Sequence, residues 1–308
     1  MSGAAKGFAL AVTAGFCWGS MAVAGQYLMT GFGFSAEDLG CLRVFGAGVI
    51  LAVLSLLFHP KDARRIFTDP AVFRDVLVYG FGVLGVQYTC FLSIRDANAA
   101  TAAIMVLTCP LFVIGWQALA EHRRVAGSEA AAFALAAAGT VLLVTKGRFD
   151  ALSFSAAGVF WGLLSAAIGA FCTLQPARVL KKISVMPLVG FGMLLSGTAS
   201  LFFHSPSDIA GTFTPLSSAL TLYIVAVGTA LAFFCYLKSL AFVPPSVTAI
   251  LAAFEPFFAV LLSVLLLGMS FSTAEVIGGL CIFAMVFVLA AGQRKAAAKA
   301  AAKPSPEC

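Results

Sequence analysis

The chain has 308 residues, of which 61% are hydrophobic and only 10% are charged, and its net charge is +6. An ordinary soluble domain carries roughly a quarter charged residues, so the composition excludes a typical soluble protein. Apolar runs of about 18 residues or more cross a bilayer as helices, and the sequence holds many. A transmembrane β-barrel is excluded, because its strands are segments of about 10 residues with alternating polarity.

The apolar runs predict ten membrane spans joined by short loops. The predicted spans are 7–29, 36–58, 74–94, 97–119, 126–145, 154–175, 185–203, 218–237, 245–267 and 273–292. The polar segment 59–75 is expected to lie along the membrane surface, and 293–308 forms a basic tail.

Two sequence stretches recur in the second half of the chain. "GFCWG" (15–19) returns as "GVFWG" (158–162), and a second pair of segments aligns Pro110 with Pro256. Because each half has five spans, the second half enters the membrane from the opposite side. The predicted fold is therefore an all-α polytopic membrane protein of ten helices in two inverted five-helix repeats, 7–147 and 153–292. Secondary transporters commonly use this arrangement.

The Lys and Arg residues predict the orientation, since they are retained on the cytoplasmic side. With both ends of the chain inside, fifteen of the 19 Lys and Arg residues fall in inner segments and three in outer loops, while Arg43 lies within a span. We therefore predict cytoplasmic termini. The positive net charge is a topology signal, and no nucleic-acid partner is expected.

The order and spacing of several motifs resemble a known family. "WG" opens each half, "LRVFGAG" (42–48) lies in the second span and "EPFFAVLLSVLLLG" (255–268) in the ninth. Over about 7–292 the chain resembles EamA-domain members of the drug/metabolite transporter superfamily, most of all bacterial aromatic amino acid exporters of the YddG type. The resemblance implies a multi-pass exporter of the inner membrane with a small-molecule substrate. It implies no cofactor or metal, and no oligomer is indicated.

Trp18 and Trp161 occupy equivalent positions of the two repeats, well inside their spans. Trp normally sits at the membrane interface, so these positions need a reason. The rings could pack against the glycine pairs of the same helices, where missing side chains let helices approach. They could equally form two aromatic walls of a central substrate cavity.

Gln87 and Tyr88 are the deepest polar residues of the third span, and their polar atoms need partners inside the hydrocarbon. We expect them to contact substrate, although an interhelical hydrogen bond would satisfy them as well.

Glu255 and Pro256 interrupt the most apolar segment of the chain. A charge within the membrane costs from about 2.5 kcal/mol upward and usually faces a cavity or a partner. Proline removes a backbone donor and kinks a helix. Glu255 could therefore contact substrate or a proton, or pair with Arg43, which is expected to be a structural charge. The predicted hinge and gating residues are Pro110, Pro256, Gly15, Gly19, Gly158 and Gly162.

Other functional classes fit the sequence less well. No span carries Asp or His near its middle, and neither HExxH nor a P-loop motif occurs, so an enzyme is not expected. A channel would need a ring of like charges or a carbonyl filter. A sugar-phosphate exchanger would need more cationic residues in its cavity. A lipophilic cation exporter stays the main alternative, because Trp faces and Glu255 suit a cation. The three histidines, among them His204, are expected to be solvated.

Overall fold

The computed structural model describes residues 3–96, 105–106, 108–120, 122, 124–151, 155–252, 254–267 and 272–301. In this part of the chain all regular structure is helical and no strand occurs. The elements are α1 (Gly3–Phe32), α2 (Ala36–Phe58), α3 (Pro60–Thr68), α4 (Pro70–Asp96), α6 (Cys109–Ala120), α7 (Gly127–Thr145), η1 (Phe149–Ala151), α8 (Ala156–Leu174), α9 (Pro176–Val179), α10 (Val185–Ser200), η2 (Pro206–Asp208), α11 (Pro215–Val225), η3 (Ala226–Leu231), α12 (Ala232–Ser239), α13 (Pro245–Leu251), α14 (Phe254–Leu267) and α15 (Thr273–Ala301). The part of the predicted span 97–119 that precedes α6 lies mostly outside the described residues, and so does the end of the tail from residue 302.

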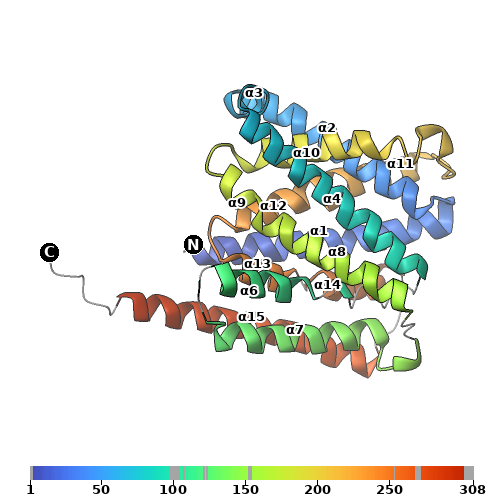
Figure 1. The fold of residues 1–308 in the computed structure, drawn as a ribbon. Coiled ribbons are helices and arrows are strands. Elements are labelled where there is room, and N and C mark those ends of the chain that lie inside the picture. Colours follow the sequence, from blue (N-terminus) through green and yellow to red (C-terminus); the bar gives the residue numbers. More distant parts are fainter. Residues whose placement is uncertain are drawn as a thin grey trace.

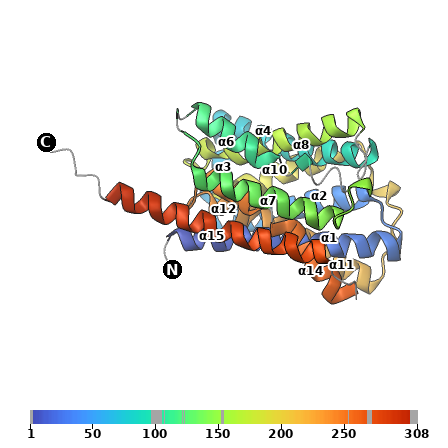
Figure 2. The same ribbon diagram turned by 90° about the horizontal axis from the view of Figure 1, so that it is seen from below.

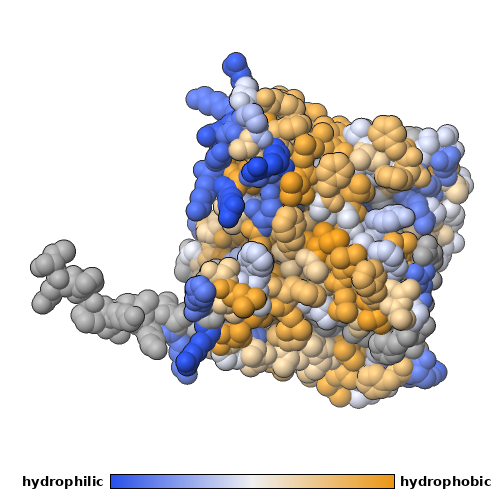
Figure 3. All heavy atoms as spheres, in the orientation of Figure 1, coloured by the Kyte–Doolittle hydropathy of each residue, from blue (hydrophilic) through white to orange (hydrophobic). Residues whose placement is uncertain are grey.

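Within the described residues, five helical stretches are long and apolar enough to cross a membrane: Gly3–Phe32, Ala36–Phe58, Ala156–Val179, Pro215–Ser239 and Pro245–Leu266. Many large apolar side chains on the bundle face outward. In Figure 3 apolar residues cover the middle of the molecule, and hydrophilic residues gather at the end where α3 lies. An apolar exterior is what a helix bundle presents to lipid tails.

The long helices run in one general direction through the bundle (Figures 1 and 2). The start of α1 and the end of α15 lie at the same end, together with α3 and α9. The main neighbours are α2 with α10, α7 with α15, α4 with α8, and α1 with both α14 and α12. Two of these pairs, α2 with α10 and α7 with α15, join a helix of the first half of the chain to the helix at the same place in the second half.

The α2–α10 pair is packed with backbone against backbone. A Cβ added to Gly48 would lie 2.3 Å from the Leu194 nitrogen, and one added to Gly197 would lie 2.5 Å from the Phe45 Cα. These distances leave no room for any side chain. Small residues let helices approach in this way and gain van der Waals contact in a bilayer.

Polar contacts fasten the same pair at the α3 end. Asp62 of α3 accepts hydrogen bonds from the Ser184 backbone nitrogen at 2.9 Å and from its hydroxyl at 2.6 Å. Ser184 is the N-cap of α10, so a residue of the first half caps a helix of the second. Lys182 Nζ donates to Asp69 at 3.1 Å across the same junction. The polar segment 59–75 thus contains a short helix that joins the two halves.

Two predicted spans are interrupted rather than continuous. The span predicted at 218–237 contains a π-helical turn, η3, in which the Thr229 hydroxyl donates to the Ile224 carbonyl at 2.9 Å. The span predicted at 245–267 is divided into α13 and α14. Pro256 cannot donate to the carbonyl of Ala252, and the Glu255 nitrogen takes that carbonyl instead at 2.9 Å. The missing proline donor accounts for a change of hydrogen bonding at this point.

Candidate functional site

Glu255 lies in the first turn of α14, directly after the interruption. A helix N-terminus carries a partial positive charge, which favours a carboxylate there. Glu255 is deep in the bundle, yet its residue keeps some accessible surface. The interruption therefore places an acidic group at a helix end inside the protein.

The α1 helix presses against this turn through two glycines. A Cβ on Gly15 would lie 3.3 Å from the Glu255 nitrogen, and one on Gly19 would lie 2.5 Å from the Glu255 carbonyl oxygen. Both glycines are buried. The backbone of Glu255 is therefore held by α1 at two successive turns, and a larger residue at either glycine would displace it.

The corresponding glycines of α8 make a similar contact with other helices. Ser93 of α4 donates from its hydroxyl to the Gly158 carbonyl at 2.7 Å. A Cβ on Gly162 would lie 2.5 Å from the Met105 Cβ. Pro110, which begins α6 with Cys109, is buried. Both halves of the chain thus use their paired glycines as close contact points.

Trp18 contacts rings of another helix, whereas the ring contact of Trp161 is with its neighbour in sequence. The Trp18 ring lies 5.3 Å from the Phe233 ring and 5.4 Å from the Tyr236 ring, both on α12. Tyr236 in turn shares a hydrogen bond of 3.0 Å with Thr173 of α8. Trp161 stacks edge-on with its neighbour Phe160 at 5.0 Å. Neither Trp is fully buried, and Trp18 ties α1 to α12.

Gln87 and Tyr88 point to different surroundings. The Gln87 Nε2 is buried and has no hydrogen-bond partner in the described part of the chain. The Tyr88 residue is 62% exposed. The two predicted substrate contacts are therefore not equivalent, since one is a buried donor without an acceptor and the other lies on an open surface.

Arg43 provides a second buried donor without a partner. It lies on α2, deep in the bundle, and its Nε has no acceptor among the described residues. Its guanidinium is within electrostatic range of the Glu255 carboxylate, and the thiol of Cys90 on α4 is within range of both. Across the described ranges Arg43 and Glu255 nevertheless form no direct ion pair. The direct pair that the sequence allowed is thus not made.

A pocket of about 540 Å³ opens between α4, α6 and α8. Two opposite charges, Asp75 and Arg178, and three aromatic rings, Phe112, Trp116 and Phe171, contribute to its lining. Gln175 also lines it and donates to the Asp75 carbonyl at 3.0 Å. The volume is in the range of small-molecule sites. The sequence did not predict this pocket, because its lining comes from α4, α6, α8 and α9, whose relative rotation the sequence leaves open.

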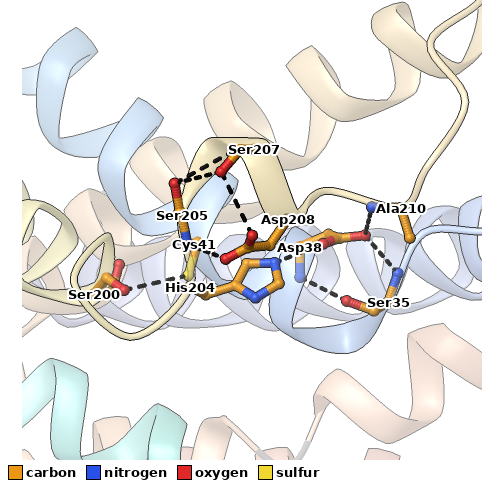
Figure 4. A network of polar contacts seen from close by, with 9 residues as sticks. All are labelled: Ser35, Asp38, Cys41, Ser200, His204, Ser205, Ser207, Asp208 and Ala210. Carbon is orange, nitrogen blue, oxygen red and sulfur yellow. Dashed lines mark hydrogen bonds and ion pairs between the residues drawn. The ribbon is translucent and has the colours of Figure 1, made fainter.

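A polar network at the end opposite α3 was also missed (Figure 4). Asp38 is fully buried and accepts hydrogen bonds from the backbone nitrogens of Ser35 and Ala210, at 2.8 and 3.2 Å. His204 Nε2 lies 2.7 Å from the other Asp38 oxygen. His204 was predicted to be solvated, and 21% of its side chain is exposed, but its ring is also held by Asp38. A capping box, with Ser35 before Asp38, was the only local signal for this site.

Comparisons with known proteins agree with this architecture. The profile of the EamA-like transporter family matches twice, over residues 5–145 and 156–291. The chain is 34% identical to the uncharacterized inner membrane transporter YicL of Salmonella typhimurium (strain LT2), over 96% of this chain and 99% of that one. It is 25% identical to the uncharacterized transporter YcbK of Bacillus subtilis (strain 168), over 61% and 62% of the two chains. One solved crystal structure has the same fold, with a TM-score of 0.79 and 18% identity over 94% of this chain and 98% of that one. The chain is a multi-pass membrane protein that belongs to the EamA-like transporter family.

Proposed function

We propose that this protein is a secondary-type transporter that exports amino acids, including large neutral and aromatic ones, by alternating access. The observation that carries the proposal is the interrupted helix α13–α14, with Glu255 at the break. Transporters of inverted-repeat design bind substrate near the membrane midplane, where broken helices offer their ends to polar groups. Glu255 and Pro256 are then the centre of the site and its hinge.

The proposal includes ten spans in two inverted repeats. Two successive matches to one family profile support a repeat. The helix pairing supports it too, because α1 packs on α14 and α12 while its counterpart α8 packs on α6 and α4. The charge bias of fifteen against three supports cytoplasmic termini. The resemblance to a protein named as an inner membrane transporter supports that membrane as the location.

Within this proposal the sequence-predicted residues keep their roles. Trp18 and Trp161 border the cavity, and Gln87, Tyr88 and Glu255 contact substrate. The hinge and gating residues are Pro110, Pro256, Gly15, Gly19, Gly158 and Gly162. The pocket between α4, α6 and α8 adds an entry route, since Arg178 at its edge belongs to the segment around α9 at the basic end of the bundle.

The second candidate is an exporter of lipophilic cations, which Glu255 and the aromatic rings favour. A counterflow assay in proteoliposomes, with labelled amino acids and organic cations, decides between the two. Exchange of large neutral amino acids, which persists at a reduced rate in Glu255→Gln, supports the first. Exchange of cations alone, abolished in Glu255→Gln, supports the second. Wild-type protein that moves no amino acid refutes the amino acid proposal.

A further inference from the structure

We propose that Arg43 and Gln87 bind the carboxylate of the substrate while Glu255 faces its ammonium group. The inference rests on the proposed function and narrows its substrate class to zwitterionic α-amino acids. It changes the role expected of Arg43 from a structural charge to a ligand of the substrate.

The first argument is that two buried donors lack acceptors. Arg43 Nε and Gln87 Nε2 are both buried and both without a hydrogen-bond partner in the described residues. An unsatisfied buried donor destabilises the folded protein, and a charged one does so more strongly. Such atoms in a native protein call for an explanation, and an absent ligand is one. Because both atoms are donors, the ligand group that would satisfy them is an acceptor, and a carboxylate accepts from both.

The second argument is that these donors belong to one region. Gln87 and Cys90 are three residues apart on α4, so they share a face of that helix. The Cys90 thiol is within electrostatic range of Arg43 and of Glu255. The α2, α4 and α14 helices therefore direct an arginine, a glutamine and a glutamate toward the same part of the interior. Arg43 and Glu255 both keep accessible surface at this depth, which a ligand or water can reach.

The third argument is the separation of the two charges. Arg43 and Glu255 interact through space but do not form a salt bridge, although both are described residues. The backbone of Glu255 is fixed against α1 by Gly15 and Gly19, so a closer approach to Arg43 would have to come from the side chain alone. Fixed opposite charges with a gap between them match the carboxylate and ammonium of an α-amino acid.

The net charge of the site selects the class of ligand. Arg43 and Glu255 together carry no net charge, and a zwitterion leaves that sum unchanged. An organic cation would leave one uncompensated positive charge, and a simple anion one negative charge. An unpaired ion in a low-dielectric interior is strongly destabilising, so the site favours a zwitterion over both.

The test is competition against counterflow of labelled phenylalanine in proteoliposomes. The competitors are phenylalanine, which carries both charges, and three analogues. Phenylalaninamide and phenethylamine lack the carboxylate, and 3-phenylpropionate lacks the ammonium group. For wild-type protein we expect the three analogues to compete at least about tenfold more weakly than phenylalanine, a difference of about 1.4 kcal/mol. Equal competition by phenylalaninamide and phenylalanine would overturn the proposal without any variant.

Arg43→Gln should weaken competition by phenylalanine and remove its advantage over phenylalaninamide, whereas Arg43→Lys should keep part of it. Gln87→Glu places a negative charge beside the carboxylate and should reverse the preference in favour of phenylalaninamide. The control is Arg74→Gln, at an exposed arginine whose side chain is 74% accessible, and it should behave as wild type. A folded Arg43→Gln or Gln87→Glu protein with the wild-type preference contradicts the inference. Wild-type protein that exchanges no amino acid contradicts the proposed function instead.

Discussion

His204 and Asp38 form a hydrogen bond between the two halves of the chain, with 2.7 Å between Nε2 and Oδ1 across 166 residues of sequence. Asp38 has no accessible surface, and its other oxygen accepts from two backbone nitrogens. The carboxylate thus joins the start of α2 to the segment that follows α10 (Figure 4). The α2–α10 pair is therefore fastened at this end as well as at the α3 end.

His204→Ala should lower the free energy of unfolding by about 1.5–3 kcal/mol, the range for a hydrogen bond to a charged group. Thermal unfolding in detergent measures the change. His59→Ala is the matched control, because His59 precedes α3 without a side-chain capping bond to that helix. Equal unfolding temperatures for His204→Ala and wild type would show that the bond contributes nothing to stability.

Gly48→Ala should be strongly destabilising, because the new methyl group would lie 2.3 Å from the Leu194 backbone nitrogen. Backbone cannot move aside as a flexible side chain does, and overpacking of this kind costs roughly 1–3 kcal/mol or more. Gly115→Ala in α6 is the control, since no atom of the described residues lies within 4 Å of its added Cβ. It should be neutral or slightly stabilising. The yield of folded protein and the unfolding temperature separate the two variants.

The Lys182–Asp69 contact should make stability depend on pH. The hydrogen bond from Lys182 holds the pKa of the Asp69 carboxyl below its ordinary value. A depressed pKa in the folded state adds stability above the unfolded value of about 3.9, which is lost as pH falls through the folded pKa. Lys182→Gln should therefore unfold at a slightly lower temperature than wild type at pH 7. The difference should vanish in acid below the folded pKa of Asp69.

Lys181→Gln removes an equal charge from the neighbouring exposed position and is the control for that comparison. It should show no such pH-dependent difference from wild type. A Lys182→Gln deficit that persists unchanged at low pH would assign the effect to something other than the Asp69 carboxylate.

Substitution of Trp18 and of Trp161 should distinguish an effect on protein stability from an effect on transport. Trp18→Ala removes ring contacts with Phe233 and Tyr236, and aromatic truncations in a core cost about 3–5 kcal/mol. Trp161→Ala should lower the unfolding temperature less and reduce counterflow more than it reduces folded protein. Parallel losses of transport and of folded protein in Trp161→Ala would favour a packing role for that ring too.

Single cysteines should report the topology. We expect residues substituted at Gly33 and Ala210 to react with a membrane-impermeant reagent from outside, and one at Leu180 to react from inside. Labelling of whole cells and of inverted vesicles gives the two sides. Reversed labelling at any two of these positions would refute cytoplasmic termini.

The helical fold and several contact points could be predicted from sequence, because apolar run length and glycine or proline placement are local signals. Pro256 was predicted to kink one continuous span, and the structure instead ends α13 at Leu251 and starts α14 at Phe254. The spacing of Arg43 and Glu255 along their helices gave their approximate depth but not the direction of either side chain. The sequence therefore could not decide between an ion pair and two separated charges.

The contacts of His204 were out of reach for a related reason. Its partner Asp38 lies in a segment that becomes a neighbour only when α2 packs on α10. No local sequence pattern predicts the contact between His204 and Asp38, and a histidine in a loop is solvated in most proteins. The π-helical turn η3 likewise depends on how Gly228 packs against Met21 of α1.

The close fit of α2 with α10 has a consequence for how the protein is made. At about 5–20 residues per second, the ribosome needs roughly ten to thirty seconds to advance the 166 residues from Asp38 to His204. During that interval α2 has been synthesised, but α10, which packs against Gly48 of α2, has not. Glu255, whose charge opposes that of Arg43, has not been synthesised either. The close contact between α2 and α10 therefore forms late in synthesis. Until α10 has been inserted, the packing surface of α2 must be covered by the insertion machinery or by lipid.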